Sequence, residues 1–299
     1  KPKQAIDSAR QLVAELLRAS KEQVIFNSGS TESINHVLKS SFFSALQSGK
    51  NHLVVSAIEH KAVLEVANYL ESIGCQVTRV GVDANGVLNL EELSQSLTEK
   101  TFLVSVMLVN NETGVIQPIE DVVSISNEKE IPVFTDATQA VGKMDVDVTS
   151  LGVDYLCLSA HKISGPKGVG ALYLKNPDSL EPFMHGGSQE KSKRGGTYNV
   201  PGIVGLGKAA EIALRELESR VLFYKKKKEI LFVGRLVPEK GVDLYVDVIE
   251  SVANKFPDWK FNLIGSYRLG DDSSKGSFVN IVINKFKNIS DQTEFYGFQ

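Results

Sequence analysis

The sequence predicts an α/β protein built on a mostly parallel sheet, followed by a second and smaller α/β unit. Two observations predict this class. Short apolar runs alternate with segments whose apolar residues recur at helical spacing, which is typical of a parallel sheet covered by helices on both faces. After the lysine run 225-KKKK-228 the same alternation starts again. We expect a first domain over residues 1–223 and a second over 224–299.

Helices and strands follow one another in a regular order. The chain begins with an expected helix over residues 3–18, in which Ile6, Val13 and Leu17 share one face. Asn89, with Glu92 three residues later, fits the capping box of another helix. The expected strands are 24–26, 53–58, 76–82, 102–109, 132–137, 155–160, 230–234, 261–265 and 293–298. Further helices are expected from about residue 31 to 46, from 60, at 119–129 and 201–222, from 238 to about 256, and at 277–287.

Composition excludes several classes of protein. With 42% hydrophobic and 23% charged residues, the chain can bury a sizeable core like an ordinary globular protein. A net charge of −3 gives no reason to expect a nucleic-acid partner. No apolar run approaches the roughly 20 residues that span a membrane, and no signal peptide is visible, so we expect a cytoplasmic protein. Two cysteines cannot form a disulfide framework, and no Cys/His spacing predicts a metal site.

Polar residues follow the predicted strands at one edge of the sheet. Asn111, Asp136 and Lys162 each come shortly after an apolar strand, and parallel sheets bind ligands at these strand ends. An aldehyde-bearing pyridine cofactor needs a lysine for covalent attachment and an acid beside its ring nitrogen. Lys162 in 158-LSAHKISGPKGVG-170 can provide the amine, and Asp136 in 134-FTDATQ-139 can provide the acid.

Other residues can hold the ring and the phosphate of the same cofactor. Gln139 can reach the ring oxygen, and His60 can stack on the ring and move protons. The turn 28-SGST-31 precedes a helix N-terminus, where free N–H groups favour a phosphate. Ser159 and His161 add polar groups nearby. Taken singly, these residues are more readily explained as solvated side chains, helix caps or turns, but together they predict one cofactor site.

Six motifs follow one another along the first domain. They are 28-SGSTES-33, 59-EHKAVL-64, 109-VNNETG-114, 135-TDATQAVGK-143, 159-SAHKISGPKGVGALY-173 and 194-RGGTYNVPGIVG-205. In this order they resemble the motifs of the class V, fold-type-I enzymes that use pyridoxal 5′-phosphate, and most of all those of the cysteine desulfurases. The resemblance covers about residues 2–220 and implies conversion of L-cysteine or a related amino acid to alanine, with the sulfur left on the enzyme. It also implies a homodimer and a sulfur-acceptor protein.

This resemblance implies a role for each site residue. Lys162 is the expected attachment point of the cofactor, and Asp136 the partner of the pyridine nitrogen. Gln139 is placed at the ring hydroxyl, and His60 is the expected stacking group and acid/base. Asn111 is placed close to the cofactor oxygen and the substrate. The positions matched to the phosphate are Ser30, Thr31, Ser159, His161 and, reaching the phosphate of the neighbouring subunit, Thr197.

The chain departs from the resembled family in the residues that accept the sulfur and bind the substrate carboxylate. That family has a nucleophilic cysteine on a mobile loop of its smaller C-terminal domain and an arginine that binds the substrate carboxylate, and neither segment is found here. Cys75 and Cys157 lie in apolar strand patterns and are expected to be buried and unreactive. We therefore expect that this chain does not turn over cysteine through a persulfide.

The second domain contains the stretch 231-LFVGRLVPEKGVDLYVDVI-249. Over about residues 229–299 the chain resembles the nucleotide-sugar-binding domain of GT-B glycosyltransferases of the retaining family 4 type. The resemblance implies that Arg235 and Lys240 bind the donor diphosphate. Both residues are equally explained as solvated charges at a helix start. The family's paired-glutamate motif is not found, so we expect no glycosyl transfer.

Three alternatives stay open beside a cysteine desulfurase. One is a different class V activity, such as an aminotransferase or a selenocysteine lyase, which the reaction products distinguish. Another is a fusion that binds the cofactor and does not catalyse a reaction. The last is a nucleotide-sugar-binding fragment.

Overall fold

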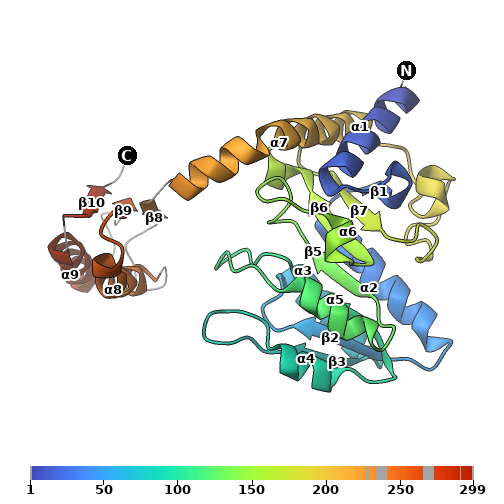
Figure 1. Cartoon of the computed structure of the whole chain (residues 1–299), viewed down its shortest axis with the longest axis horizontal. Coiled ribbons are helices and arrows are strands. Elements are labelled where there is room, and N and C mark those ends of the chain that lie inside the picture. Colours follow the sequence, from blue (N-terminus) through green and yellow to red (C-terminus); the bar gives the residue numbers. More distant parts are fainter. Residues whose placement is uncertain (1, 227–228, 234–240, 265–272, 290, 298–299) are drawn as a thin grey trace. The chain divides into compact units, whose positions relative to one another are not determined.

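The computed structural model describes residues 2–226, 229–233, 241–264, 273–289 and 291–297 (Figure 1). By its internal contacts the chain divides into two compact units, Lys1–Val221 and Leu222–Gln299. Each unit has its own sheet and its own apolar core. Within the described ranges, no helix combines the length and the apolar character needed to span a bilayer.

The first unit contains a seven-stranded sheet in the order β1–β7–β6–β5–β4–β2–β3. Strand β7 is antiparallel to both of its neighbours, and the other neighbouring strands are parallel. The predicted mostly parallel α/β sheet is confirmed. Its strands are β1 (Val24–Asn27), β2 (His52–Ser56), β3 (Gln76–Val80), β4 (Thr101–Ser105), β5 (Val133–Asp136), β6 (Tyr155–Ser159) and β7 (Gly170–Leu174).

Helices cover both faces of this sheet (Figure 1). Because side chains alternate along a strand, Leu53 and Val55 of β2 pack with α2 and α3, whereas Val54 joins the cluster that includes α1, α4, α5 and α7. Most members of both clusters are fully buried. The helices are α1 (Pro2–Leu17), α2 (Ser30–Leu46), α3 (Lys61–Ser72), α4 (Leu90–Ser96), α5 (Ile119–Asn127), α6 (Val148–Leu151) and α7 (Val200–Lys226).

Two local predictions were wrong. No strand was expected at Gly170–Leu174, where the structure has β7, which pairs with β6 and β1. The capping box at Asn89 is only half made. The Asn89 side chain accepts a hydrogen bond from Glu92 N at 3.0 Å, but the Glu92 carboxylate accepts from Gly81 N instead of from Asn89 N. Asn89 N already donates to Gly81 O, so it needs no side-chain partner.

A buried ion pair ties α1 to the segment between β7 and α7. The guanidinium of Arg10 donates two hydrogen bonds to the Glu190 carboxylate, both at 2.7 Å. Phe26 N in β1 also donates to Glu190, at 3.0 Å, and the Glu190 side chain is only 2% exposed. Glu190, Lys191 and Ser192 all have left-handed backbone angles, which non-glycine residues adopt at a cost. We infer that the ion pair helps to hold this unfavourable backbone in place.

The second unit contains a parallel three-stranded sheet in the order β10–β9–β8. Helices α8 and α9 pack on it through a small core that includes Val246, Phe261, Leu263 and Phe286. Both candidate diphosphate ligands, Arg235 and Lys240, lie outside the described residues. The elements are β8 (Glu229–Val233), α8 (Val242–Val252), β9 (Lys260–Ile264), α9 (Ser273–Ile289) and β10 (Thr293–Gly297).

Candidate functional site

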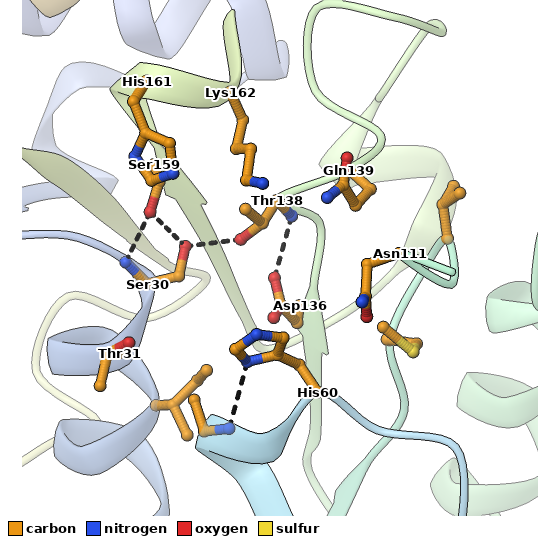
Figure 2. A pocket seen from close by; sticks show the side chains of 14 residues that line it. Ser30, Thr31, His60, Asn111, Asp136, Thr138, Gln139, Ser159, His161 and Lys162 are labelled. Carbon is orange, nitrogen blue, oxygen red and sulfur yellow. Dashed lines mark hydrogen bonds between the residues drawn. The ribbon is translucent and has the colours of Figure 1, made fainter. Parts of the chain in front are cut away.

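A cavity of about 290 Å³ opens beyond the carboxyl ends of the parallel strands in the first unit (Figure 2). Its walls combine four apolar side chains with ten polar ones, so the cavity is more polar than the usual small-molecule site and suits a charged ligand. The structure brings together nine of the residues that the sequence singled out, from segments far apart in the chain. These nine are Ser30, Thr31, His60, Asn111, Asp136, Gln139, Ser159, His161 and Lys162.

Lys162 projects into this cavity from the short helix η2 (Ala160–Ile163), which follows β6 directly (Figure 2). The turn closes tightly because Gly165 N donates to Ala160 O at 2.8 Å, and Ser164 adopts a left-handed conformation. Within the described residues, Nζ of Lys162 makes no hydrogen bond and no ion pair. Its charge acts on a neighbouring lysine: burial first, and then the charge of Lys162, lower the pKa of Lys143. The Lys162 amine is therefore free to react with a ligand.

Asp136 is the last residue of β5 and lies 6% exposed at the floor of the cavity. Its Oδ1 accepts hydrogen bonds from Thr138 N at 2.9 Å and from Cys157 Sγ at 3.4 Å. These donors stabilise the ionised carboxylate. No described residue donates to Oδ2, which leaves this oxygen available to a ligand. Asp136 can thus pair with a cationic group bound in the cavity.

The N-terminus of α2 forms another wall. Gly29 precedes the helix with φ of 142°, a conformation that favours glycine. Ser30 N donates to Ser159 Oγ at 2.9 Å, and the Ser30 hydroxyl shares hydrogen bonds with Ser159 at 2.9 Å and with Thr138 at 2.5 Å. Positive partial charge at a helix N-terminus, joined here by three hydroxyl groups, favours an anionic ligand.

Positive charge surrounds the same wall. Loss of hydration, and then the charges of Lys162 and Lys167, lower the pKa of His161. The neutral imidazole is therefore favoured, and His161 can offer a ring N–H to an anion without adding a further charge. A phosphate bound here would meet helix N–H groups, hydroxyls and two lysines.

His60 and Gln139 are oriented by local hydrogen bonds. His60 caps α3, and its Nδ1 accepts from Ala62 N at 3.1 Å, so the neutral ring carries its proton on Nε2. Gln139 Oε1 accepts from Lys143 Nζ at 2.5 Å, which leaves the Gln139 amide nitrogen as the donor for a ligand. Both side chains line the cavity together with Asn111.

Other predicted residues lie elsewhere, and one contributor was missed. Thr197 does not line this cavity; it belongs to a second one of about 210 Å³, together with Arg194 and Tyr198. Thr138 was not singled out, although its hydroxyl and its backbone N–H join the Ser30 and Asp136 networks. Its position within 134-FTDATQ-139, two residues after the candidate acid, was the available signal.

Both cysteines are buried, as expected from the sequence. Cys75 is 4% exposed and Cys157 is fully buried in β6. Burial raises the pKa of Cys75 to about 11 and raises that of Cys157 well above its usual range. Neither side chain is a thiolate at neutral pH.

Two family models match the chain. The family model described as aminotransferase class-V matches residues 1–254 of the chain. The chain belongs to this family. A second model, glycosyl transferases group 1, matches residues 215–299, so the two matches overlap.

Relatives of this class-V chain include cysteine desulfurases. Cysteine desulfurase IscS of Dictyoglomus turgidum is 44% identical over 254 residues, which cover 85% of this chain and 63% of that protein. A solved NifS-like protein has 45% identity and a TM-score of 0.71, covering 73% of this chain and 60% of its own. The structure described as SspA in complex with cysteine has 32% identity and a TM-score of 0.68, covering 97% of this chain and 84% of its own. The chain thus spans less than two thirds of the length of the Dictyoglomus protein.

Enzymes of the class-V family use pyridoxal 5′-phosphate, and the cavity fits this group. An unpaired amine lies opposite a carboxylate that has one free oxygen, and a helix N-terminus with hydroxyl groups closes one end. Apolar side chains complete the walls for a flat ring. They are Ile34, Ala62, Met107 and Val109.

Proposed function

We propose that residues 1–223 form the cofactor-binding large domain of a cysteine desulfurase, with pyridoxal 5′-phosphate as its cofactor and L-cysteine as its substrate. The observation that carries the proposal is the convergence of Lys162, Asp136 and the N-terminus of α2 on one cavity. Support for the substrate comes from the desulfurase relatives and from the related structure with cysteine. Nothing in the site favours the aminotransferase or selenocysteine lyase alternatives.

Each residue has a task that follows from its surroundings. Lys162 attaches the cofactor through its unpaired amine, and Asp136 keeps the ring nitrogen protonated through its free Oδ2. The bound cofactor supplies a ring that withdraws electrons from the α-carbon of the amino acid. Ser30 at the start of α2 and Ser159 at the end of β6 bind the phosphate together with Thr31 and His161.

The side chains on the other walls orient the ring and the substrate. His60 lies against the ring and moves a proton through Nε2, because Nδ1 is engaged by Ala62 N. Gln139 donates its amide N–H to the ring oxygen, and Asn111 lies near the substrate. The thiolate that receives the sulfur is neither Cys75 nor Cys157, since both thiols are buried and protonated.

The proposal extends to assembly and location. We propose a homodimer in which Thr197, which lies outside the Lys162 cavity of its own subunit, reaches the phosphate of the neighbouring subunit. The proposal also includes a cytoplasmic location and a sulfur-acceptor protein, since the sulfur taken from cysteine must pass to a second molecule.

A nucleotide-sugar-binding role is the second candidate, for residues 224–299. It is supported by the match to glycosyl transferases group 1 over residues 215–299. Arg235 and Lys240 would bind the diphosphate. Titration with a nucleoside diphosphate sugar, compared between the wild-type chain and an Arg235→Ala/Lys240→Ala variant, tests this role.

Covalent trapping tests the leading proposal. The full chain is incubated with pyridoxal 5′-phosphate and treated with borohydride, which converts lysine-bound cofactor into a stable pyridoxyl-lysine. Peptide mapping is expected to place the adduct on Lys162, and Lys162→Ala should abolish it. Lys100→Ala removes an exposed lysine that does not line the cavity and should leave the adduct intact. An adduct on another lysine would overturn the assignment.

A further inference from the structure

Glu59 is a buried carboxyl group that the proposed chemistry does not use. It lies directly before His60, in the turn between β2 and α3, and is 5% exposed. Its Oε1 accepts a hydrogen bond from Met107 N at 2.6 Å. Its Oε2 is buried and has no hydrogen-bond partner among the described residues. An ionised carboxylate is strongly disfavoured in such a position, because it has lost its hydration and gained only one donor.

The hydrogen bonds of this turn join two walls of the cavity. Glu59 binds Met107 N, and the side chain of Asn110 donates to Ile58 O at 3.0 Å. Met107 lines the cavity on one side, and His60 lines it on another. Glu59 therefore connects the turn that carries His60, the candidate acid/base, to the segment that follows β4.

A second carboxylate lies close enough to act on Glu59. Burial raises the pKa of Glu59 well above its usual range, the Met107 N–H opposes this shift, and the charge of Asp136 adds to it. Among the described residues, Asp136 at the end of β5 is the charged group that influences Glu59; from the β4 side the facing group is the Met107 N–H. The ring of neighbouring His60 is turned to Ala62 N.

The two carboxyl groups differ in their donors. Asp136 accepts hydrogen bonds from a backbone N–H and from a thiol and keeps one oxygen open to the cavity, whereas Glu59 accepts from one N–H and is sealed off. When two neighbouring carboxyl groups have such different surroundings, the one with poorer solvation and fewer donors holds the proton.

We propose that Glu59 is a positioning residue that works as a neutral acid. It keeps the proton of the Glu59–Asp136 pair, so that Asp136 carries the negative charge facing the cavity, and it holds the His60 turn against Met107. The protonation of Glu59 stands independently of the proposed function. Its effect on cofactor binding rests on that function.

Infrared spectroscopy of the full chain, without added cofactor, tests the protonation. The wild-type protein at neutral pH should show the carbonyl stretch of a protonated carboxyl group, and Glu59→Gln should lack it. Asp136→Asn removes the neighbouring charge, so the band should titrate at a lower pH than in the wild type. Absence of the band from the wild type, its persistence in Glu59→Gln, or an unchanged titration in Asp136→Asn would each overturn the proposal.

Cofactor affinity tests the positioning role. Gln keeps both the shape of the neutral acid and an oxygen for Met107 N, so Glu59→Gln should bind pyridoxal 5′-phosphate like the wild type. Glu59→Leu leaves Met107 N unpaired and should weaken binding by about tenfold. Equal affinities of the two variants would overturn the positioning role. If the wild type itself fails to bind, the proposed function fails, and the infrared result still decides the state of Glu59.

Discussion

Cys157 and Asp136 are register partners on neighbouring strands, and the thiol donates to the carboxylate with 3.4 Å between Sγ and Oδ1. A cysteine in this position supports an anion. Ionisation of the Cys157 thiol itself is unfavourable, because burial and the charge of Asp136 both raise its pKa. The same contact therefore strengthens the candidate partner of the ring nitrogen and removes Cys157 from the set of nucleophiles.

Thiol labelling checks this view of the cysteines. In the folded chain at pH 8, the raised pKa of Cys75, about 11, leaves roughly one thiol in a thousand ionised, against about one in ten for an ordinary thiol. Alkylation of Cys75 should therefore be at least about a hundredfold slower than that of a free thiol, and Cys157 should be slower still. Mass spectrometry follows both sites, with the urea-unfolded chain as the rapidly labelled control. Rapid native labelling at either site would show that the thiol is accessible.

Sulfide release is expected to be absent. The chain loaded with pyridoxal 5′-phosphate and given cysteine and a reductant should not form sulfide and alanine over many turnovers, because Cys75 and Cys157 are both buried and protonated. Sulfide and alanine are measured together, with the Cys75→Ser/Cys157→Ser double variant as control. Sustained production that the double variant loses would contradict this expectation.

Asp136→Asn keeps the side-chain shape and removes its charge. Exchange of the α-proton of a bound amino acid should fall by roughly a hundredfold, because the ring nitrogen loses its anionic partner. Cofactor affinity should change much less. Deuterium incorporation followed by NMR measures the first quantity and equilibrium titration the second. Asp145→Asn, at an exposed carboxylate, is the matched control. Equal losses of exchange and affinity would make Asp136 only a structural cap.

The Arg10–Glu190 pair should dominate the local stability of the first unit. Glu190→Ala leaves a mostly buried guanidinium without its partner and should lower the free energy of unfolding by about 3–5 kcal/mol. Asp145→Ala breaks the exposed contact with Arg18 and should cost less than about 1 kcal/mol. Unfolding followed by circular dichroism compares the two variants. Similar losses would show that burial does not distinguish these pairs.

Glu59→Gln should become more stable relative to the wild type as pH rises. Above the ordinary glutamate pKa of 4.5, the unfolded wild-type chain releases a proton that the folded chain retains. The free energy of unfolding of the wild type therefore falls as the pH rises. The amide that replaces the carboxyl group in the variant does not titrate. The difference should grow by up to about 1.4 kcal/mol per pH unit until folded Glu59 ionises. Melting temperatures across the pH range give the slope, and parallel curves would mean that folded Glu59 ionises normally.

Much of the fold was predictable because most strands of the first unit are buried on both faces and read as apolar runs. Strand β7 was not predicted because it begins at Gly170, at the end of a segment rich in glycine and proline. Such a segment indicates a turn, and the apolar residues that follow it were not interpreted as a strand. The places of Asp136 and Lys162 at the cavity were predictable because Asp136 ends an apolar strand and Lys162 lies in the short helix that follows another. The burial of Glu59 was not predictable, because a charged residue directly before a helix is usually exposed to solvent. Only the packing around Met107 N reveals that Glu59 is buried.

The antiparallel strand β7 has a consequence for synthesis of the chain. In the described structure β1 has β7 as its neighbour in the sheet, and Ser30 bonds to Ser159, 129 residues later. A ribosome produces β1 and the start of α2 early, but their partners emerge only after every parallel strand of the first unit has been made. The phosphate-side wall therefore cannot assemble step by step with translation. It closes in a late, long-range event, and until then β1 offers an unpaired apolar edge that chaperones are expected to cover.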